Sequence, residues 1–366
     1  MTSETPSEYF ASRRERLQAQ LEAREIAALL VTNLTNIFYL TGFRGSAGVA
    51  LIGPSRSVLW VDPRYTLQAR EQARGLEVKE VRGSLLKEAV RWIRRRGLGR
   101  VGYEDSTLTC REFSLLDQAR NQKLRWVPSG GLVEDLRVVK DTEEINCIRR
   151  ACRLTVEVFE EVRREVRAGV RESDLAAEIE YRMKRKGADG FAFETIVSSG
   201  LRSAWPHAHP SSKLLQKSDL VIFDLGAILG GYAADLTRTL YLGAPGARVR
   251  RLYNAVREAQ ERAVEATLCG KRACDIDRVA RKALERRKLE SYFTHSTGHG
   301  VGLEIHEKPR LGRSDKTRLE SGCVITVEPG VYLEGFGGIR VEDTVLVTAG
   351  TPEVLTPASK EAWYTG

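Results

Sequence analysis

Residues 220–242 read LVIFDLGAILGGYAADLTRTLYL, two apolar, strand-like runs that carry one buried-looking acid each. The two runs predict a β-hairpin closed by Leu229-Gly230. This register places Asp224 opposite Asp235, and directly opposed residues share one face of a hairpin. Two carboxylates directly opposite each other on one face repel each other strongly unless a positive charge lies between them.

A second pair of strand-like runs, Val324–Tyr332 and Gly338–Val347, flanks a glycine-rich turn. A turn centred on Gly335 places Glu328 opposite Glu342, again on one face. The chain therefore offers two hairpins, each with an opposed pair of acids.

A single acid of this kind could cap a turn or pair with Arg238 or Arg340. Four acids in apolar strands need more positive charge than one arginine supplies. A pair of divalent metal ions is the simplest explanation, and it makes the chain a candidate hydrolase.

All five histidines lie between His207 and His306. His299 stands in Gly298-His299-Gly300-Val301-Gly302, where the glycines allow a close backbone approach. The segment is not a dinucleotide fingerprint, because Leu303 follows it and no strand-to-helix context is evident. Four carboxylates and one imidazole form an oxygen-rich ligand set that favours Mn²⁺, with Co²⁺ or Zn²⁺ as alternatives.

A chain of 366 residues predicts two domains. Alternating strands and helices indicate an α/β domain over 1–135, and 136–366 reads as α+β. The pattern predicts helices at 7–25, 65–73, 85–95, 141–166, 172–186 and 248–288, and strands at 27–32, 49–52, 57–61, 191–200, 219–241, 323–332 and 338–348.

Composition narrows the functional classes. The net charge of +9 comes from scattered basic residues without zinc-finger spacing or an aromatic-basic stretch, so we do not expect nucleic acid as a partner. The six cysteines form no C-x-x-C, which favours buried, reduced thiols. No run is apolar enough for a membrane span, and the polar segment 1–10 carries no secretory signal, so we expect a cytoplasmic protein.

These motifs resemble the pita-bread metallopeptidases, the family of creatinase, aminopeptidase P and prolidase, and in particular its proline-specific branch. The resemblance rests on segments in family order along nearly the whole chain. They are 39–48 (YLTGFRGSAG), 62–65 (DPRY), 223–226 (FDLG), 231–239 (GYAADLTRT), 295–302 (HSTGHGVG), 305–307 (IHE), 327–332 (VEPGVY) and 338–343 (GIRVED).

The resemblance implies a role for each matching residue. Asp224 would hold one metal ion, His299 and Glu328 the other, and Asp235 and Glu342 would bridge both. Glu328 would also act as general base. The remaining implied site residues are His306 for the tetrahedral intermediate, His207 for the substrate carbonyl, and His295, Tyr332 and Arg340 for the prolyl pocket.

The resemblance also implies a dinuclear-metal exopeptidase that hydrolyses Xaa-Pro bonds. The motifs around Arg44 and Arg64 favour an aminopeptidase P, which acts on peptides with proline at the second position. The alternative is a prolidase, an Xaa-Pro dipeptidase, and a remote alternative is a non-catalytic peptide or nucleic-acid binder on the same fold. We expect a homodimer or homotetramer.

Overall fold

The computed structural model describes residues 6–54 and 56–364. Its contacts divide the chain into two compact units, Met1–Arg137 and Val138–Gly366, whereas the sequence pattern suggested a boundary near residue 135. Residues 1–5 of the polar segment expected to lack a signal lie outside the described part. Among the described helices, none has the length and apolar character needed to cross a membrane.

The first unit contains one mixed six-stranded sheet in the order β4-β3-β2-β1-β5-β6. Strand β1 pairs antiparallel with β2 and parallel with β5. The unit's elements are α1 (Pro6–Ala23), β1 (Ala28–Val31), α2 (Leu34–Thr41), β2 (Val49–Ile52), β3 (Val58–Val61), α3 (Thr66–Gln72), β4 (Glu77–Glu80), α4 (Leu85–Arg96), β5 (Arg100–Tyr103), α5 (Cys110–Gln118), β6 (Arg125–Pro128) and α6 (Leu132–Val138).

The second unit is α+β, as the pattern predicted. Its helices are α7 (Thr142–Val162), α8 (Glu172–Arg185), α9 (Ala247–Glu265) and α10 (Ala273–Glu285). Its strands are β7 (Gly190–Phe191), β8 (Ile196–Ser199), β9 (Leu220–Leu225), β10 (Ala227–Leu229), β11 (Tyr232–Ala233), β12 (Leu236–Leu242), β13 (Gly298–Gly300), β14 (Glu307–Leu311), β15 (Val324–Val327), β16 (Gly330–Leu333), β17 (Gly337–Arg340), β18 (Asp343–Leu346), β19 (Glu353–Val354) and β20 (Trp363–Tyr364).

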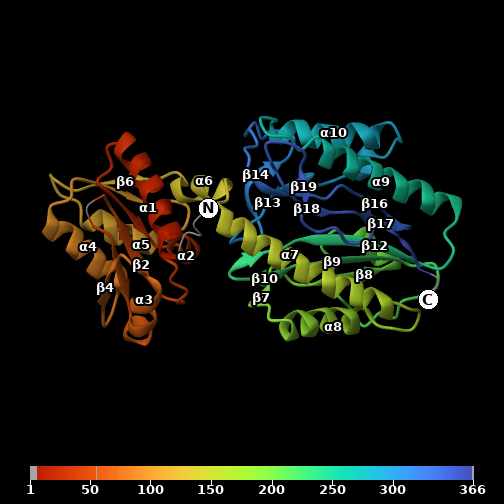
Figure 1. Ribbon diagram of the computed structural model, residues 1–366, viewed down its shortest axis with the longest axis horizontal. Helices are drawn as coiled ribbons and strands as arrows, with labels where there is room; N and C mark the ends of the chain where they lie inside the picture. The colour runs from red at the N-terminus through yellow and green to blue at the C-terminus, as the bar shows by residue number, and fades with distance from the viewer. Residues whose placement is uncertain (1–5, 55, 365–366) are drawn as a thin grey trace. The chain divides into compact units, whose positions relative to one another are not determined.

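Two helical layers enclose the strands of this unit. Helices α7 and α8 pack on β9 and β12 through residues such as Phe159 and Phe223. Helices α9 and α10 cover the strands on the opposite side, where Val256 and Ile276 join the core with Ile325 (Figure 1). The buried faces of the helices thus hold the strands between two apolar cores.

The first hairpin forms, but the predicted register is wrong. Its turn is Gly230-Gly231, both with positive φ (65° and 84°), rather than Leu229-Gly230. A two-residue turn with positive φ at both positions matches the twist of a hairpin, and glycine adopts positive φ without steric strain. Asp224 therefore pairs with Thr237 instead of Asp235. Because the shift is two residues, both acids still lie on one face.

The second hairpin has the predicted register. Val327 pairs with Asp343 and Gly330 with Arg340, so Glu328 and Glu342 stand opposite each other. The ladder is interrupted at these two acids, because β15–β18 and β16–β17 belong to different sheets. Glu328 and Glu342 therefore lie between strands, where the regular alternation of side chains does not fix their direction.

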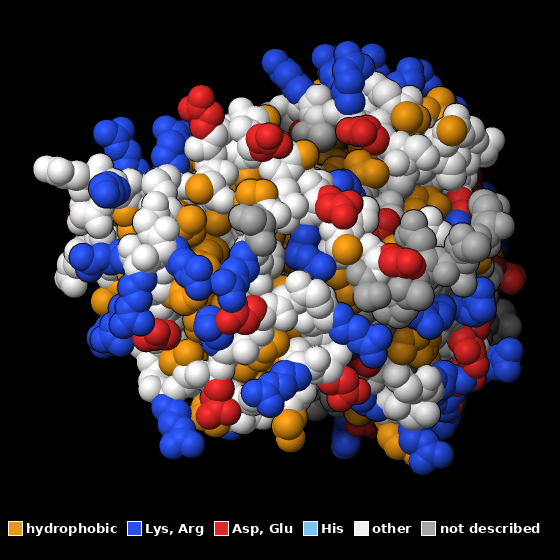
Figure 2. All heavy atoms as spheres, turned by 60° about the vertical axis from the view of Figure 1, so that its left-hand side comes forward, with side chains coloured by type: hydrophobic (Ala, Val, Ile, Leu, Met, Phe, Trp, Pro, Cys, Tyr) orange, Lys and Arg blue, Asp and Glu red, His pale blue; other side chains and the backbone are white. Residues whose placement is uncertain are grey.

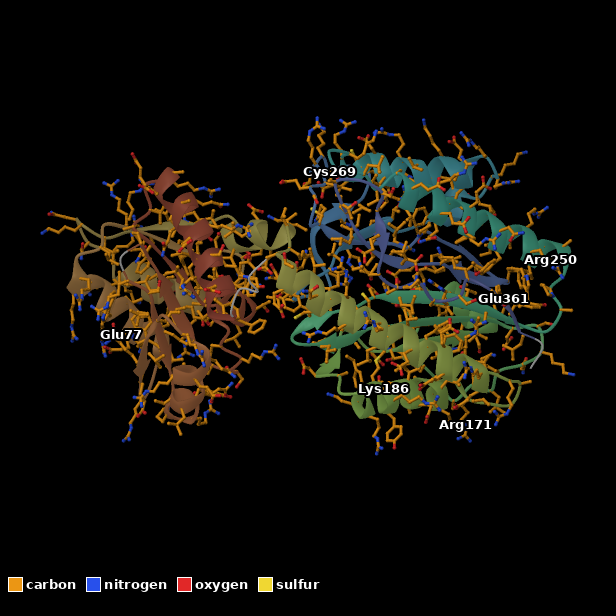
Figure 3. All side chains as sticks on the ribbon, in the orientation of Figure 1. Glu77, Arg171, Lys186, Arg250, Cys269 and Glu361 are labelled. Atoms are coloured by element: carbon orange, nitrogen blue, oxygen red, sulfur yellow. The ribbon has the colours of Figure 1, made fainter. Side chains whose placement is uncertain are left out.

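The surface mixes both charges. Figure 2 shows Lys and Arg side chains interspersed with Asp and Glu on the face it presents. All six cysteines are free, and four are buried as expected. Cys110 and Cys269 are exposed, however, and Cys269 can be located in Figure 3.

Candidate metal centre

The first pair of acids comes from one face of the β9–β12 hairpin. Asp224 lies within β9 and accepts a hydrogen bond from Arg340 Nη2 at 2.5 Å. Asp235 lies between β11 and β12 and is 5% exposed. The chain can bend here because residue 226 is glycine: a Cβ on Gly226 would lie 2.0 Å from the Ala234 carbonyl oxygen. The bend brings Asp235 towards the interior.

The second pair of acids is fixed by backbone hydrogen bonds. The Glu328 amide donates to the Thr297 carbonyl at 2.8 Å, and the Glu342 amide donates to the Thr237 carbonyl at 3.1 Å. The Thr237 hydroxyl also donates to Glu342 Oε2 at 2.6 Å. The two bonds between Thr237 and Glu342 tie the second hairpin to the first, and the Glu328 bond ties it to the segment that precedes β13.

His299 on β13 completes this group. Its Nε2 lies 3.5 Å from Asp235 Oδ2 and 3.5 Å from Glu328 Oε1. Its Nδ1 lies 3.1 Å from the Gly300 carbonyl oxygen, which can only accept a hydrogen bond. Nδ1 therefore carries the proton, and Nε2 presents a lone pair to the acids.

Gly298 is required by the packing of this strand. A Cβ at residue 298 would lie 1.9 Å from the Thr326 carbonyl oxygen, which is backbone and has little freedom to move. We expect Gly298→Ala to displace β13 from β15, lowering the melting temperature and the metal affinity together. Thermal unfolding with and without added Mn²⁺ tests this, with Gly350→Ala as the control because residue 350 has open space for a Cβ. Unchanged metal affinity in the Gly298 variant would contradict it.

The donor set fits divalent cations. One ligand atom from each of Asp235, His299 and Glu342 lies within 4.8 Å of the other two. Asp224 and Glu328 line the same cavity outside this tightest group. Asp224 Oδ1 and Glu342 Oε1 are buried and accept no hydrogen bond from the described residues 6–54 and 56–364. Buried oxygens of this kind need a positive partner.

The electrostatics point the same way. Burial, and then the neighbouring Glu342 and Asp224, hold the pKa of Asp235 well above its usual value. Burial also raises the pKa of Glu342, and it raises that of Glu328 to about 8. The alternative partner considered from the sequence, Arg340, does pair with Asp224, but the other acids keep raised pKa values despite it. Divalent ions would restore the ionised carboxylates.

His295, Tyr332 and Arg340 form a hydrogen-bonded chain beside this group. His295 Nδ1 donates to the Ser296 carbonyl at 2.8 Å, so the Tyr332 hydroxyl donates to His295 Nε2 at 2.9 Å. The Tyr332 oxygen in turn accepts from Arg340 Nη1 at 2.8 Å. Burial lowers the pKa of His295 to about 4, which keeps the ring neutral in this chain.

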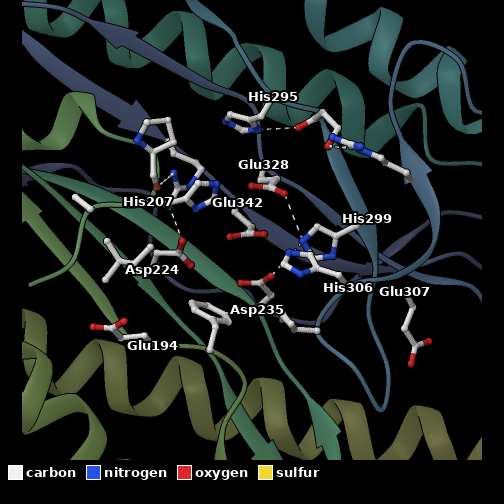
Figure 4. Close-up of a pocket in the computed structure, with 18 of the residues that line it drawn as sticks. Glu194, His207, Asp224, Asp235, His295, His299, His306, Glu307, Glu328 and Glu342 are labelled. Carbon is white, nitrogen blue, oxygen red and sulfur yellow. Dashed lines mark hydrogen bonds and ion pairs between the residues drawn. The ribbon is translucent and has the colours of Figure 1, made fainter. Parts of the chain in front are cut away.

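His306 and His207 face the same cavity. The rings of His306 and His299 are 4.4 Å apart in an edge-to-face arrangement. Burial, and then the charge of His207, lowers the pKa of His306. Figure 4 shows Glu328 and Glu342 between Asp224 on one side and His299 with His306 on the other.

The cavity has a volume of about 760 Å³ and is lined by every predicted site residue except Tyr332, which lies behind His295 and Arg340. Its wall also includes residues that the sequence reasoning missed, among them Glu194 and Arg310. His209 Nδ1 lies 2.8 Å from Glu194 Oε2. The sequence carried no signal for Arg310: β14 begins at Glu307 and its pairing with β13 shifts register, so alternation along 306–310 does not assign this side chain to the face of His306.

Comparison with known proteins identifies the architecture. Residues 146–349 match metallopeptidase family M24, and residues 13–139 match the creatinase/prolidase N-terminal domain. The chain belongs to metallopeptidase family M24. The resemblance drawn from the motifs is thus confirmed, together with the order of an α/β N-terminal domain and a pita-bread catalytic domain.

Relatives that match nearly the whole of this M24 chain include two Xaa-Pro dipeptidases and an X-Pro aminopeptidase. It is 35% identical over 350 residues to the Xaa-Pro dipeptidase of Pyrococcus furiosus, covering 95% of this chain and 99% of that protein. The solved Xaa-Pro dipeptidase of Bacillus anthracis superposes with a TM-score of 0.93 at 38% identity, covering 97% and 99% of the two chains. The X-Pro aminopeptidase of Thermotoga maritima superposes with a TM-score of 0.88 at 34% identity, covering 97% and 100%.

Proposed function

We propose that this M24 metallopeptidase is an Xaa-Pro dipeptidase that uses two divalent cations. The observation that carries the proposal is the convergence of four carboxylates and His299 on one cavity, with buried oxygens that lack a hydrogen-bond donor among the described residues. The motifs alone favoured an aminopeptidase P. The dipeptidase alternative is better supported, because relatives that match nearly the whole chain are described as Xaa-Pro dipeptidases.

The ligands of the two ions are Asp224, Asp235, His299, Glu328 and Glu342 in this proposal. Mn²⁺ is the ion we expect, because oxygen ligands predominate. A pair of such ions would lower the pKa of the attacking water and polarise the scissile carbonyl.

The chain's own residues supply the remaining chemistry. The Glu328 carboxylate accepts a proton from the attacking water and returns it to the prolyl nitrogen. Neutral His306 donates a hydrogen bond to the developing oxyanion, as the lowered pKa of this imidazole allows. His207 contacts the substrate carbonyl, and the hydrogen-bonded set His295, Tyr332 and Arg340 shapes the prolyl pocket.

Arg310 is proposed to bind the free carboxylate that distinguishes a dipeptide. It lines the cavity and is exposed, and within the described residues its Nε donates to the neutral Ser296 hydroxyl at 3.4 Å. A guanidinium binds a carboxylate through two parallel hydrogen bonds. A longer peptide would present an uncharged amide at the same place.

Substrate length tests the proposal. We expect Mn²⁺-loaded protein to hydrolyse Ala-Pro and to leave Ala-Pro-Ala almost untouched, because the tripeptide lacks a carboxylate next to its proline ring. Chromatographic detection of free alanine and proline, after chelation and metal addition, measures both. Efficient cleavage of the first bond of Ala-Pro-Ala would instead establish an aminopeptidase P.

Arg310→Gln is expected to weaken this preference. Losing a hydrogen bond to a charged group costs about 1.5–3 kcal/mol, so kcat/KM for Ala-Pro should fall roughly ten- to a hundredfold. Hydrolysis of Ala-Pro-amide, which has no carboxylate, should change little. Arg313→Gln is the matched control, because that side chain is 70% exposed and pairs with Glu290. Equal losses on both substrates would contradict the role.

We further propose a homodimer or homotetramer for this peptidase. Light scattering coupled to size-exclusion chromatography measures that state directly.

A further inference from the structure

A buried ion pair on α10 lies outside the cavity yet touches the segment that carries two of its histidines. Asp277 and Arg281 are one helical turn apart, and Arg281 Nε lies 2.8 Å from Asp277 Oδ2. Their side chains are only 2% and 12% exposed. The proposed chemistry uses neither residue. Their burial sets them apart from the more exposed Arg278–Asp275 pair on the same helix.

Arg281 uses its remaining donors on backbone carbonyls. Nη2 donates to the His295 carbonyl at 2.6 Å, and Nη1 donates to the Phe293 carbonyl at 3.1 Å. The guanidinium also lies over the Phe293 ring, 4.4 Å from its centroid. One side chain thus fixes the backbone on both sides of Thr294, and with it the position of the His295 ring.

Asp277 holds the next residues of the same segment. Its Oδ1 accepts from the Thr297 hydroxyl at 2.8 Å and from the Thr297 amide at 3.3 Å. The Thr297 carbonyl then accepts the Glu328 amide at 2.8 Å. Thr297 therefore connects the ion pair to Glu328, and it stands two residues before His299.

We propose that Asp277 and Arg281 are positioning residues that hold 293–299 in the geometry needed for hydrolysis. The inference rests on the proposed function for its kinetic consequence, but not for its structural content. The carboxylate orients the guanidinium, and the guanidinium and the carboxylate together fix the carbonyls, the amide and the hydroxyl of the segment. Groups of this kind act by keeping reacting groups in place, and a displacement of about 1 Å can cost roughly a hundredfold in rate.

A second hollow gives solvent access to the same pair. Its volume is about 460 Å³, and its wall includes Asp277, Arg281, Arg278 and Glu290. Removing the Arg281 side chain would enlarge this hollow next to the Asp277 carboxylate. A small planar cation could then enter from solvent and occupy the place of the lost guanidinium.

Arg281→Ala is the main test. We expect kcat for Ala-Pro to fall about ten- to a hundredfold, the usual cost of removing a partner that orients site residues, while KM changes much less. Hydrogen exchange measured by mass spectrometry should accelerate in peptides covering 293–299, and other peptides of the second unit should keep their protection. Millimolar guanidinium chloride should restore both kcat and protection, whereas equal NaCl or urea should not.

Two further variants separate positioning from general stability. Arg281→Lys keeps the charge but loses the planar fork that serves Asp277 and both carbonyls at once, so it should remain impaired in kcat. Thr297→Val keeps the shape and removes one donor to Asp277, so it should show a smaller defect with the same kcat-over-KM pattern. Arg278→Ala is the matched control, because Arg278 lies on the same helix, lines the same hollow and pairs with Asp275 instead.

The outcomes distinguish this inference from the proposed function. Unchanged exchange at 293–299 in Arg281→Ala would overturn it, whatever the enzyme hydrolyses. Faster exchange with unchanged kcat would also overturn it, since the segment would then not need the pair. If wild-type protein fails to cleave Ala-Pro, the proposed dipeptidase fails, and exchange with guanidinium rescue still decides the role of the pair.

Discussion

Replacing Asp235 with asparagine is expected to abolish Mn²⁺-dependent hydrolysis of Ala-Pro and, at the same time, to stabilise the metal-stripped protein. The amide keeps the shape of the carboxylate but removes one buried charge from a group in which Glu342, Asp224 and Glu328 all raise the pKa of Asp235. Relief of that repulsion stabilises the metal-free fold. The same change removes a proposed metal ligand, which lies close to His299 and Glu342.

Thermal unfolding with and without Mn²⁺ measures both effects. A ligand at a hundredfold excess over its Kd stabilises a protein by about 2.7 kcal/mol, so wild-type protein should melt at a clearly higher temperature with Mn²⁺. Asp235→Asn should melt higher than wild type after chelation and respond little to Mn²⁺. Asp174→Asn, an exposed residue in the first turn of α8, is the control and should behave as wild type. Full activity in the Asp235 variant would refute the assignment.

The second large effect is a pH dependence of the metal-stripped protein. Burial raises the pKa of Glu328 to about 8, so its contribution to folding is present below the unfolded pKa of about 4.5 and is lost as the pH rises through 8. His295 and His299 act in the opposite direction, because burial lowers their pKa from 6.5 to about 4. Their contribution is complete above pH 6.5 and is lost as the pH falls towards 4.

Between about pH 6.5 and 8.5 the buried carboxylates should dominate the slope. We expect the unfolding free energy of chelated protein to fall across this window, and the fall to disappear with saturating Mn²⁺, which favours the ionised carboxylates. Urea unfolding at several pH values measures the slope. Glu328→Gln should make it shallower, because the amide does not ionise. A rising or flat profile in chelated wild type would show that the acids are not buried together.

Local patterns were sufficient to locate the four candidate acids. Apolar strand periodicity located the runs that carry Asp224, Asp235, Glu328 and Glu342, and a turn centred on Gly335 led to the observed register of the second hairpin. The first hairpin shows where such reasoning fails. The predicted turn was Leu229-Gly230, whereas the turn that forms uses Gly230 and Gly231, each with positive φ.

The preference for a dipeptide or a longer peptide was harder to predict from the sequence. The motifs favoured an aminopeptidase P, whereas relatives described as Xaa-Pro dipeptidases support the alternative. Arg310 bears on this choice through its place on the cavity wall, which depends on how β14 packs beside β13. A single exposed arginine after a histidine has no sequence signature that separates it from surface charge.

By itself, the sequence determined the candidate acids and the α/β and α+β character of the two parts through periodicity and residue type, and the family of the fold through its motifs. The tertiary structure alone decided which groups meet. Thr237 reaches Glu342, Arg340 reaches Asp224, and Arg281 reaches the His295 backbone, all across segments distant in the chain or on different elements. Such contacts follow from the packing of helices on strands. The hydrophobic effect that drives this packing is non-directional, so local sequence does not specify which polar groups it brings together.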